Sequence, residues 1–465
     1  MKKVFVFCIG GTGIRVMKSI TMLMASGMDT NGYVVVPIIL DPHLDLEEKK
    51  NLHSLIAEYQ EIYRRSINNG NQTLNPLSGF FGSDIRTIDD LNNQTNDTQE
   101  TAGSKEKFRS YIELANLGTS DINNFLVETL FSTKNLNNPL SVGFKGNPNV
   151  GTVVLGEMIE GAEWFKSFKQ HCEKDDRVFI ISSIFGGTGA SGYPLLEKKI
   201  RLTENEPAVK NALMGAVTVL PYYGLKDPAT TGSDIDSANF YTKTKAALAY
   251  YHGTVKADYL YYVGETSLKQ VYDNDEKKQD DKANFIELVA ASALFDFLKR
   301  GEPTHQQFLS RAIDNDKESL DIVSMGSGYK ELVKSVADFM LLRLLVEELP
   351  EEKFFPLSKS RGFDSSFYGD SAFQSLFRFC NRYYSWYLEL AQNKRAFAPI
   401  NFDNPKKMSG WIKTIELGAK DDSSYLLEMI KVSNKTKSKD HENKFRFFLQ
   451  FAYDAIDNFT KKIYK

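Results

Sequence analysis

The sequence predicts an α/β protein, with a parallel sheet in the first 270 residues and a mostly helical C-terminal part. Short apolar runs of strand length recur through those first 270 residues. Two of the runs end in glycine-rich turns that lead into helical patterns. After residue 300, apolar and aromatic residues recur mainly at helical spacing.

The first unit of the predicted sheet stands at the N-terminus. Lys2 to Ile9 is a short apolar strand, the turn Gly10-Gly11-Thr12-Gly13 follows it, and a helical pattern begins at Ile14. Such a strand, glycine turn and helix open many nucleotide-binding sheets. The dinucleotide fingerprint G-x-G-x-x-G fits poorly, because Val16 stands at the sixth position counted from Gly11 and the packing glycine is missing there. Dinucleotide binding is therefore the minor interpretation.

The second unit has the same construction. Val178 to Ile184 is an apolar strand, and a glycine-rich stretch follows it. The small residues of this stretch are Gly186, Gly187, Thr188, Gly189, Ala190, Ser191 and Gly192. The backbone N–H groups of such a turn, at the start of a helix, can cradle a polyphosphate. No Gly-Lys-Ser/Thr follows, so backbone, helix end and metal would have to meet the phosphate charge. A turn needed only for strand-to-helix packing is the alternative.

Further segments complete the predicted fold. Strands are expected at Tyr33–Leu40, Leu213–Leu220 and Asp258–Val263. A helix is expected from about 233 to 250, and Asn284–Leu298 is expected to be a long central helix.

The two glycine turns resemble those of tubulin and its bacterial relative FtsZ. The second turn of that superfamily is G-G-G-T-G-[ST]-G, and this sequence matches it at Gly186, Gly187, Thr188, Gly189 and the trailing Pro194. Phe185 replaces the first glycine and Ala190 the hydroxyl residue, with Ser191 one place later. The resemblance covers roughly residues 1 to 300. It implies a Rossmann-like sheet of the tubulin/FtsZ type that binds GTP or GDP with Mg²⁺.

Two further loops support the resemblance in the family's order. Asp41, at the end of the second strand, looks like the acidic residue that faces magnesium and phosphate, directly or through water. The stretch from Gly146 to Gly151, G-N-P-N-V-G, is similar to the FtsZ loop that senses the terminal phosphate, which implies roles for Asn147 and Gly151. Each loop alone has a simpler explanation, because a strand-end aspartate is often a cap or turn residue and Asn-Pro is ordinary turn chemistry.

The first turn of the central helix supplies the side chain that reads guanine in this superfamily. Asn284 stands at that position, and a side-chain amide can pair with a base edge. A helix-capping asparagine is the competing interpretation.

In tubulin-like filaments an acidic loop of one subunit completes the nucleotide pocket of the next, so hydrolysis requires assembly. The corresponding stretch here, Ala312 to Asp321, has candidate catalytic carboxylates at Asp314, Asp316 and Asp321. It lacks the family's G-x-x-N-x-D-x-x-[DE] spacing, and a solvated charged loop is the alternative. The resemblance implies head-to-tail self-association with GTP hydrolysis in trans, and it supports GTP binding better than hydrolysis.

The predicted layout is a nucleotide-binding domain at 1–270, a central helix at 280–300 and a mostly helical domain at 301–465. A polar insertion at about 65–145 has stretches rich in Asn, Gln, Thr and Ser, around 68–75, 92–101 and 134–138, that are expected to form surface loops. Its apolar pieces at 108–117 and 122–130 are expected to be helices packed over the sheet edge. The helical domain departs from tubulin and FtsZ, whose second domain is built on a small sheet. It would offer a surface for an unidentified protein partner.

The composition limits the binding partners and the cellular compartment that can be expected for the protein. The net charge of -3 predicts no general attraction to nucleic acid or anionic membrane. No apolar run reaches membrane-spanning length, and the first strand meets glycine too early for a signal peptide. The three cysteines form no metal or disulfide pattern, which is typical of the reducing cytoplasm.

Two other functions stay open. A nucleotide-binding scaffold that neither polymerises nor hydrolyses is favoured by the missing acidic spacing. An NAD-dependent oxidoreductase is favoured by the N-terminal glycine turn, and is opposed by Val16 and by the lack of an obvious catalytic His or Tyr-Lys arrangement. The six histidines are scattered without ligand spacing.

Overall fold

The main sheet has six strands, all parallel, in the order β10-β8-β6-β5-β1-β2. Its strands are β1 (Lys3–Ile9), β2 (Val34–Leu40), β5 (Arg177–Ser183), β6 (Leu213–Val219), β8 (Tyr259–Glu265) and β10 (Gln307–Ile313). The computed structural model describes residues 1–43, 46–70, 72–93, 106–118, 120–144, 146–226, 239–265, 270–272, 282–313, 319–320, 329–351, 362–397 and 443–461. The fold is α/β and compatible with a Rossmann-like domain.

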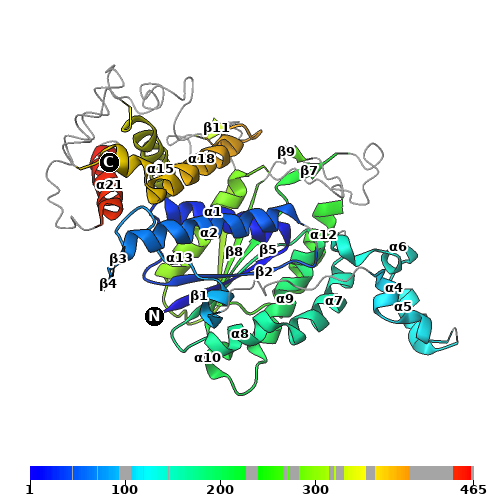
Figure 1. The fold of residues 1–465 in the computed structure, drawn as a ribbon. Coiled ribbons are helices and arrows are strands. Elements are labelled where there is room, and N and C mark those ends of the chain that lie inside the picture. Colours follow the sequence, from blue (N-terminus) through cyan, green and yellow to red (C-terminus); the bar gives the residue numbers. More distant parts are fainter. Residues whose placement is uncertain are drawn as a thin grey trace.

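Helices cover both faces of the sheet, because β1, β2, β5, β6 and β8 are buried on both sides. In β1, Val4 and Val6 face one core and Phe5 and Phe7 face the other. The first face packs against α1 (Gly10–Ala25), α2 (Glu47–Ile67) and α13 (Phe285–Lys299). The second packs against α7 (Pro148–Gly161), α8 (Glu163–His171), α9 (Gly187–Arg201) and α12 (Phe240–Thr254). Figure 1 shows the two helical layers with the sheet between them.

The strand order reverses between β1 and β5. From β1 the chain passes through α1 to β2, and it later returns across β1 to reach β5. From β5 it continues through α9, on the opposite face, to β6. In open α/β sheets, ligands bind outside the carboxyl ends of the strands beside such a reversal. Both glycine turns stand at that place.

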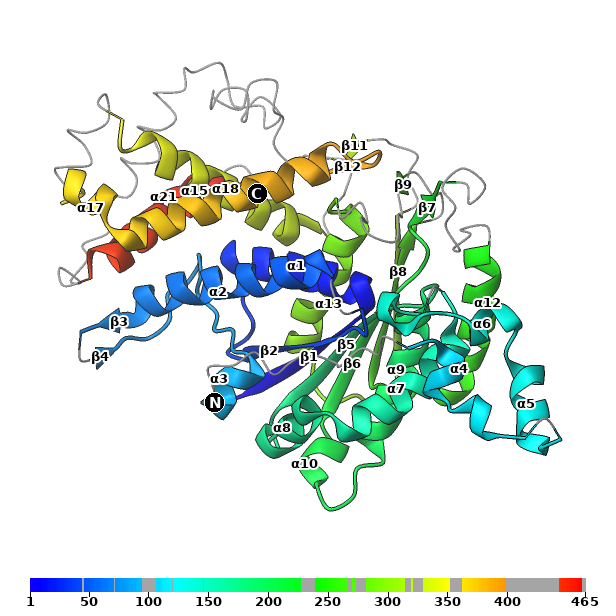
Figure 2. The same cartoon turned by 45° about the vertical axis from the view of Figure 1, so that its right-hand side comes forward.

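A third layer of helices lies over α1, α2 and α13 (Figure 2). It consists of α15 (Lys330–Glu348), α18 (Ser371–Ala391) and α21 (Lys444–Thr460), with the short α17 (Ser365–Gly369). Their apolar side chains belong to the same hydrophobic core as the first face of the sheet. The described part of 329–461 is therefore mostly helical.

One strand departs from the predicted layout. A mostly helical domain is predicted for residues 301–465, whereas Gln307–Ile313 forms β10 and pairs with β8 along its length. After β10, the short strand β11 (Ser319–Leu320) pairs with β12 (Ala396–Phe397). β12 follows the end of α18 in the sequence. The main sheet therefore extends to residue 313.

Short elements fill the remaining described chain. They are β3 (Asn68–Asn69), β4 (Gln72–Thr73), α3 (Ile88–Asn92), α4 (Phe108–Tyr111), α5 (Ile122–Leu130), α6 (Thr133–Leu136), α10 (Pro207–Lys210), β7 (Tyr223–Leu225), β9 (Gln270–Tyr272) and the 3₁₀ turns Leu114–Asn116 and Leu140–Val142. Across the described ranges, no helix combines the length and apolar character needed to cross a bilayer.

Candidate functional site

The first glycine turn begins directly at the end of β1, and α1 starts with it. Gly10 has a φ of +70°, which glycine adopts without strain. A side chain at Gly13 would place its Cβ 2.6 Å from the Cys8 carbonyl carbon, so Gly13 allows α1 to pack closely on β1. The packing glycine that the dinucleotide fingerprint lacks at Val16 is therefore supplied by Gly13. Gly11 remains partly exposed beside the buried Thr12.

The second turn likewise contains both partly exposed residues and glycines that allow close packing. Gly186 precedes α9, and both Gly186 and Thr188 are partly exposed. A Cβ on Gly189 would lie 2.4 Å from the Ser183 carbonyl oxygen, and one on Gly192 would lie 2.8 Å from a methyl group of Ile9. The packing interpretation therefore holds for Gly189 and Gly192.

Two residues of the second turn are engaged inside the fold. The Ser191 hydroxyl donates to the Gly187 carbonyl at 2.7 Å. The Ala190 carbonyl accepts from the Tyr251 hydroxyl at 3.1 Å. The Ser191 hydroxyl therefore donates its proton within α9. It is not simply a replacement for the hydroxyl that the tubulin/FtsZ motif has at the position of Ala190.

Three helix N-termini meet at the carboxyl edge of β1 and β5. A Cβ on Gly10 would lie 3.4 Å from the Thr188 Cβ, which brings the start of α1 against the start of α9. A Cβ on Gly187 would lie 3.1 Å from the backbone nitrogens of both Gly146 and Asn147. The N-terminus of α7 thus joins the other two.

No side chain caps these three N-termini. None of α1, α7 and α9 has a side-chain cap or an acidic residue in its first turn. By contrast, α13 and α18 are capped by Asn284 and Asp370. Uncapped N-termini present backbone donors and partial positive charge, so three together favour an anion.

The Asn-Pro loop is held against the second turn. Gly146 has a φ of +73°, and its carbonyl accepts from Lys243 Nζ of α12 at 2.7 Å. The Asn147 side-chain N–H donates to the Phe144 carbonyl at 3.1 Å, and the Asn147 side chain does not cap α7. A Cβ on Gly151 would lie 2.3 Å from Ser191 Oγ, so Gly151 permits the contact between α7 and α9. Lys243 adds a cation that no sequence motif marks.

Carboxylates lie on the opposite side of the first turn. Asp41, at the end of β2, is buried and its Oδ1 accepts from the His43 backbone N–H at 2.9 Å. Burial raises the pKa of Asp41 to about 6, and the neighbouring Glu48 carboxylate adds to the rise. Glu48 Oε2 would be 3.3 Å from a Cβ on Gly11, and it has no hydrogen-bond partner among the described residues.

Arg15 links these carboxylates to the central helix. Its Nη1 donates to Glu48 Oε1 at 3.0 Å and its Nε donates to Glu287 Oε1 at 2.7 Å. Tyr222 completes the cluster, because its hydroxyl donates to Glu287 Oε1 at 2.6 Å. Arg15 was detectable as a charge inside an otherwise apolar helical pattern, which demands a buried partner. The partners themselves are distant in sequence.

Asn284 occupies the N-cap of α13. Its side-chain oxygen accepts from the Ile286 N–H at 2.9 Å, and Glu287 Oε2 accepts from the Asn284 N–H at 3.0 Å. This reciprocal pair is a capping box, which the Asn-x-x-Glu spacing already indicates. The competing interpretation of Asn284 as a cap is therefore correct, and base recognition by it stays a prediction.

The candidate catalytic residues Asp314, Asp316 and Asp321 lie outside the described residues. Within the ranges described, no three or more His, Cys, Asp or Glu side chains gather as a metal cluster. A cation at Asp41 would therefore take most of its ligands from a bound nucleotide and water.

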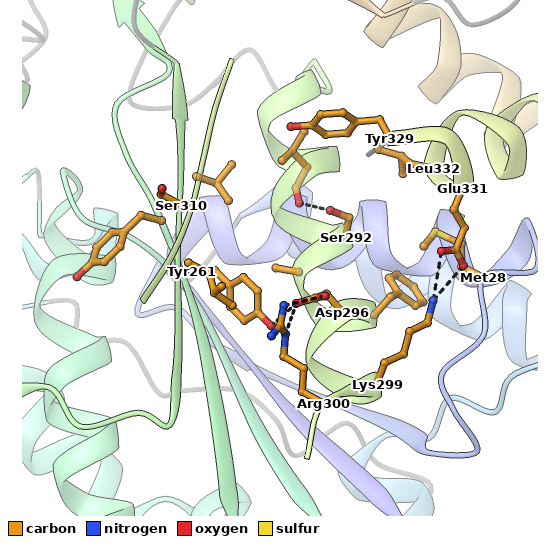
Figure 3. A pocket seen from close by; sticks show the side chains of 16 residues that line it. Met28, Tyr261, Ser292, Asp296, Lys299, Arg300, Ser310, Tyr329, Glu331 and Leu332 are labelled. Atoms are coloured by element: carbon orange, nitrogen blue, oxygen red, sulfur yellow. Dashed lines mark hydrogen bonds and ion pairs between the residues drawn. The ribbon is translucent and has the colours of Figure 1, made fainter. Parts of the chain in front are cut away.

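A cavity of about 220 Å³ lies elsewhere, between α13, α15, β8 and β10 (Figure 3). Its charged groups contact one another: Asp296 accepts from Tyr261 and Arg300, and Lys299 pairs with Glu331. None of the predicted site residues lines it. The meeting point of the two glycine turns remains the candidate site.

Comparison with known proteins adds no family to this description. No protein-family model matches the chain, and a search of curated proteins gave no significant match.

Proposed function

We propose that the protein is a tubulin/FtsZ-like GTP-binding protein that holds GTP or GDP at the carboxyl edge of β1 and β5. The observation that carries this proposal is the meeting of three helix N-termini, none with a side-chain cap or a first-turn acid. A polyphosphate complements such a site, because it brings several negative acceptor oxygens to several backbone donors.

The residues divide into those that contact phosphate and those that allow the approach. Backbone N–H groups of 10–13 and 186–188 would donate to phosphate oxygens, beside the hydroxyls of Thr12 and Thr188. Lys243, which holds the Gly146 carbonyl, places positive charge near the third helix end. Gly189, Gly192 and Gly151 contribute by letting the helices pack closely.

Asp41 fits a magnesium ion bound to the phosphates. Its carboxylate is buried, with a pKa raised to about 6, so a cation beside it would relieve the cost of its charge. The ion would neutralise phosphate oxygens, and Asp41 would hold it directly or through water.

The proposal also includes self-association and GTP hydrolysis. In a head-to-tail assembly the symmetry leaves an open filament, and an acidic loop of one subunit can reach the nucleotide of the next. Asp314, Asp316 and Asp321 are the candidates for that loop. A scaffold that binds nucleotide without turnover would use the same phosphate site.

The test is a carboxylate placed where phosphate would bind. In Thr188→Asp, a negative charge at the first turn of α9 favours the helix and repels the ligand, so stability and binding should move in opposite directions. The control Ser371→Asp makes the same charge change at the first turn of α18. Calorimetry with Mg²⁺ and GTP should show at least a tenfold loss of affinity for T188D and none for S371D; equal affinities would overturn the phosphate site.

A dinucleotide is the second candidate, favoured by the position of Asp41. An acid at the end of the second strand of a strand–glycine turn–helix–strand unit is where NAD-binding sheets hold a ribose hydroxyl. Competition between GTP, ATP and NAD decides between the candidates, since a guanine site would rank GTP first.

A further inference from the structure

The short helix α5 has an exposed apolar face, which we call its outer face. Four large apolar side chains form it, with exposed fractions of 75% at Ile122, 68% at Phe125, 52% at Leu126 and 59% at Leu130. The spacing i, i+3, i+4 and i+8 places them on one side of the helix, where Thr129 is the only other residue. The outer face therefore carries no charge. In Figures 1 and 2, α5 lies at the periphery of the molecule.

The opposite side of α5 holds the helix on the protein. Val127 and Phe131 are half-buried and pack against the hydrophobic core of the second face of the sheet. The Phe131 ring lies 5.0 Å from the Phe108 ring. None of the nine residues of α5 is fully buried, and an isolated helix shorter than about 12–15 residues is only marginally stable in water. Packing on the outer face would therefore stabilise α5.

A second copy of the chain provides enough surface for this packing. Taking about 150–250 Å² for a large side chain, the four exposed fractions amount to about 400–600 Å². When the same face of a second copy covers them, the two faces together bury about 800–1,200 Å², which reaches the lower limit of specific interfaces. An area of this size is expected to give a weak dimer.

The charges of α5 favour a protein surface over a membrane. Helices that lie in a membrane interface carry Lys and Arg on their polar side. The only ionisable residue within α5 is Glu128, and its N-cap is Asp121, so anionic lipid would repel the helix. Two uncharged outer faces, by contrast, can meet without burying a charge. An antiparallel arrangement also sets the two helix dipoles in opposite directions, which is favourable.

We propose that α5 pairs antiparallel with α5 of a second copy across a two-fold axis. Leu126 lies at the axis and meets its own copy, and Ile122 of each copy faces Leu130 of the other. A two-fold contact of this kind is closed, so it joins two molecules, or two head-to-tail filaments, side by side. None of the residues proposed to contact nucleotide belongs to α5, so the contact needs no nucleotide.

The oligomeric state without nucleotide is the first test. Sedimentation equilibrium of the wild type from about 1 to 200 μM should show a monomer–dimer equilibrium with a dissociation constant in the micromolar range. Phe125→Glu places a charge on the outer face and leaves the core intact, so it should weaken the dimer at least about tenfold. Tyr250→Glu is the matched control, because Tyr250 is a 56% exposed aromatic residue of α12. A monomeric wild type, or a dimer that survives F125E, would overturn the proposal.

Cross-linking tests the register of the pair. The three native cysteines are buried, so Leu126→Cys introduces an accessible thiol. A short bis-maleimide should join two L126C chains and should leave Tyr250→Cys unlinked; the reverse result would place the contact on α12.

Two further measurements separate this contact from other interpretations. GTP affinity of Phe125→Glu should equal that of the wild type, so a failure to dimerise would leave the proposed phosphate site standing. A wild type that stays monomeric and sediments with phosphatidylserine-containing vesicles, while F125E does not, would assign the outer face to a membrane and overturn the dimer.

Discussion

Arg15 Nε and Glu287 Oε1 lie 2.7 Å apart, which ties the second turn of α1 to the first turn of α13. Glu287 also closes the capping box of α13 through its other oxygen. One carboxylate therefore fixes the start of the central helix and holds the arginine nearest the first glycine turn. A ligand that moves Arg15 would also act on the N-terminus of α13.

Loss of the Arg15 guanidinium should be strongly destabilising. Arg15→Gln leaves the Glu48 and Glu287 carboxylates buried without their cation, and we expect a loss of about 3–5 kcal/mol in the free energy of unfolding. Arg65→Gln, which breaks the half-exposed pair with Glu61, should cost less than about 1 kcal/mol. Urea unfolding of both variants checks this, and similar losses would show that the cluster around Arg15 is not a buried ion-pair network.

Asp41 should make stability fall as pH rises. Its pKa is raised from 3.8 to about 6 in the folded protein, so below pH 4 it is neutral in both states and costs nothing. Between pH 4 and 6 the carboxyl ionises in the unfolded chain and stays protonated in the folded protein, so stability falls by at most about 3 kcal/mol and levels off above pH 6. Without nucleotide and metal, Asp41→Asn should therefore be more stable than the wild type at pH 7.5 and equally stable at pH 4.

Binding of Mg²⁺ and GTP should depend on pH in the opposite sense to the stability of the unliganded protein. If Asp41 holds the cation, affinity for Mg²⁺ with GTP rises as the carboxyl loses its proton near pH 6. Calorimetry from pH 5 to 7.5 should show a steeper rise in the wild type than in Asp41→Asn, where only the phosphate groups of the nucleotide titrate. Parallel profiles would remove Asp41 from the metal site.

The glycines of the two turns should separate into two classes. Gly189→Ala places a Cβ against the Ser183 backbone, which cannot move aside, and should destabilise by about 1–3 kcal/mol or more. Gly11→Ala places a Cβ against side-chain atoms only, Glu48 Oε2 at 3.3 Å and Arg15 Nη1 at 3.5 Å, and should destabilise less than Gly189→Ala while weakening GTP binding. Thermal unfolding and calorimetry on both variants check this; a Gly11→Ala protein with unchanged affinity would place the phosphates elsewhere.

Turnover should depend on assembly if the acidic loop acts in trans. We expect GTP hydrolysis per molecule to rise with protein concentration, and to fall when Asp314 or Asp316 becomes alanine. Phosphate release measured over a hundredfold concentration range checks this. A constant rate per molecule would indicate an isolated enzyme, and no release would favour the scaffold.

The sheet and its glycine turns were predictable because they depend on local sequence. Apolar runs bounded by glycine mark β1 and β5 to within one or two residues of their observed limits. The strand β10 was not predictable in this way. It is an edge strand with the sequence QFLSRAI, whose polar residues weaken the apolar signal that a central strand gives.

The candidate site was predictable only where a motif marks it. Gly11 and Thr188 belong to turns that the sequence displays, whereas Glu48 and Lys243 reach the site from helices that are distant in the chain. Phe185 stands where the tubulin/FtsZ motif that this turn resembles has glycine. It has a packing explanation, because its ring lies in an aromatic cluster with Tyr222 and Phe240. Such contacts depend on tertiary packing, which periodicity in a single sequence does not reveal.

The shared core of the sheet and the outer helices limits how the chain can be divided. A fragment ending at residue 313 would keep every strand of the main sheet and would strip α15, α18 and α21 from the apolar surfaces of α1, α2 and α13. Those surfaces would then face water, and the shortened polypeptide would be prone to aggregate. Truncation is therefore a poor way to separate the roles of the two halves, and full-length protein with single replacements is the better route.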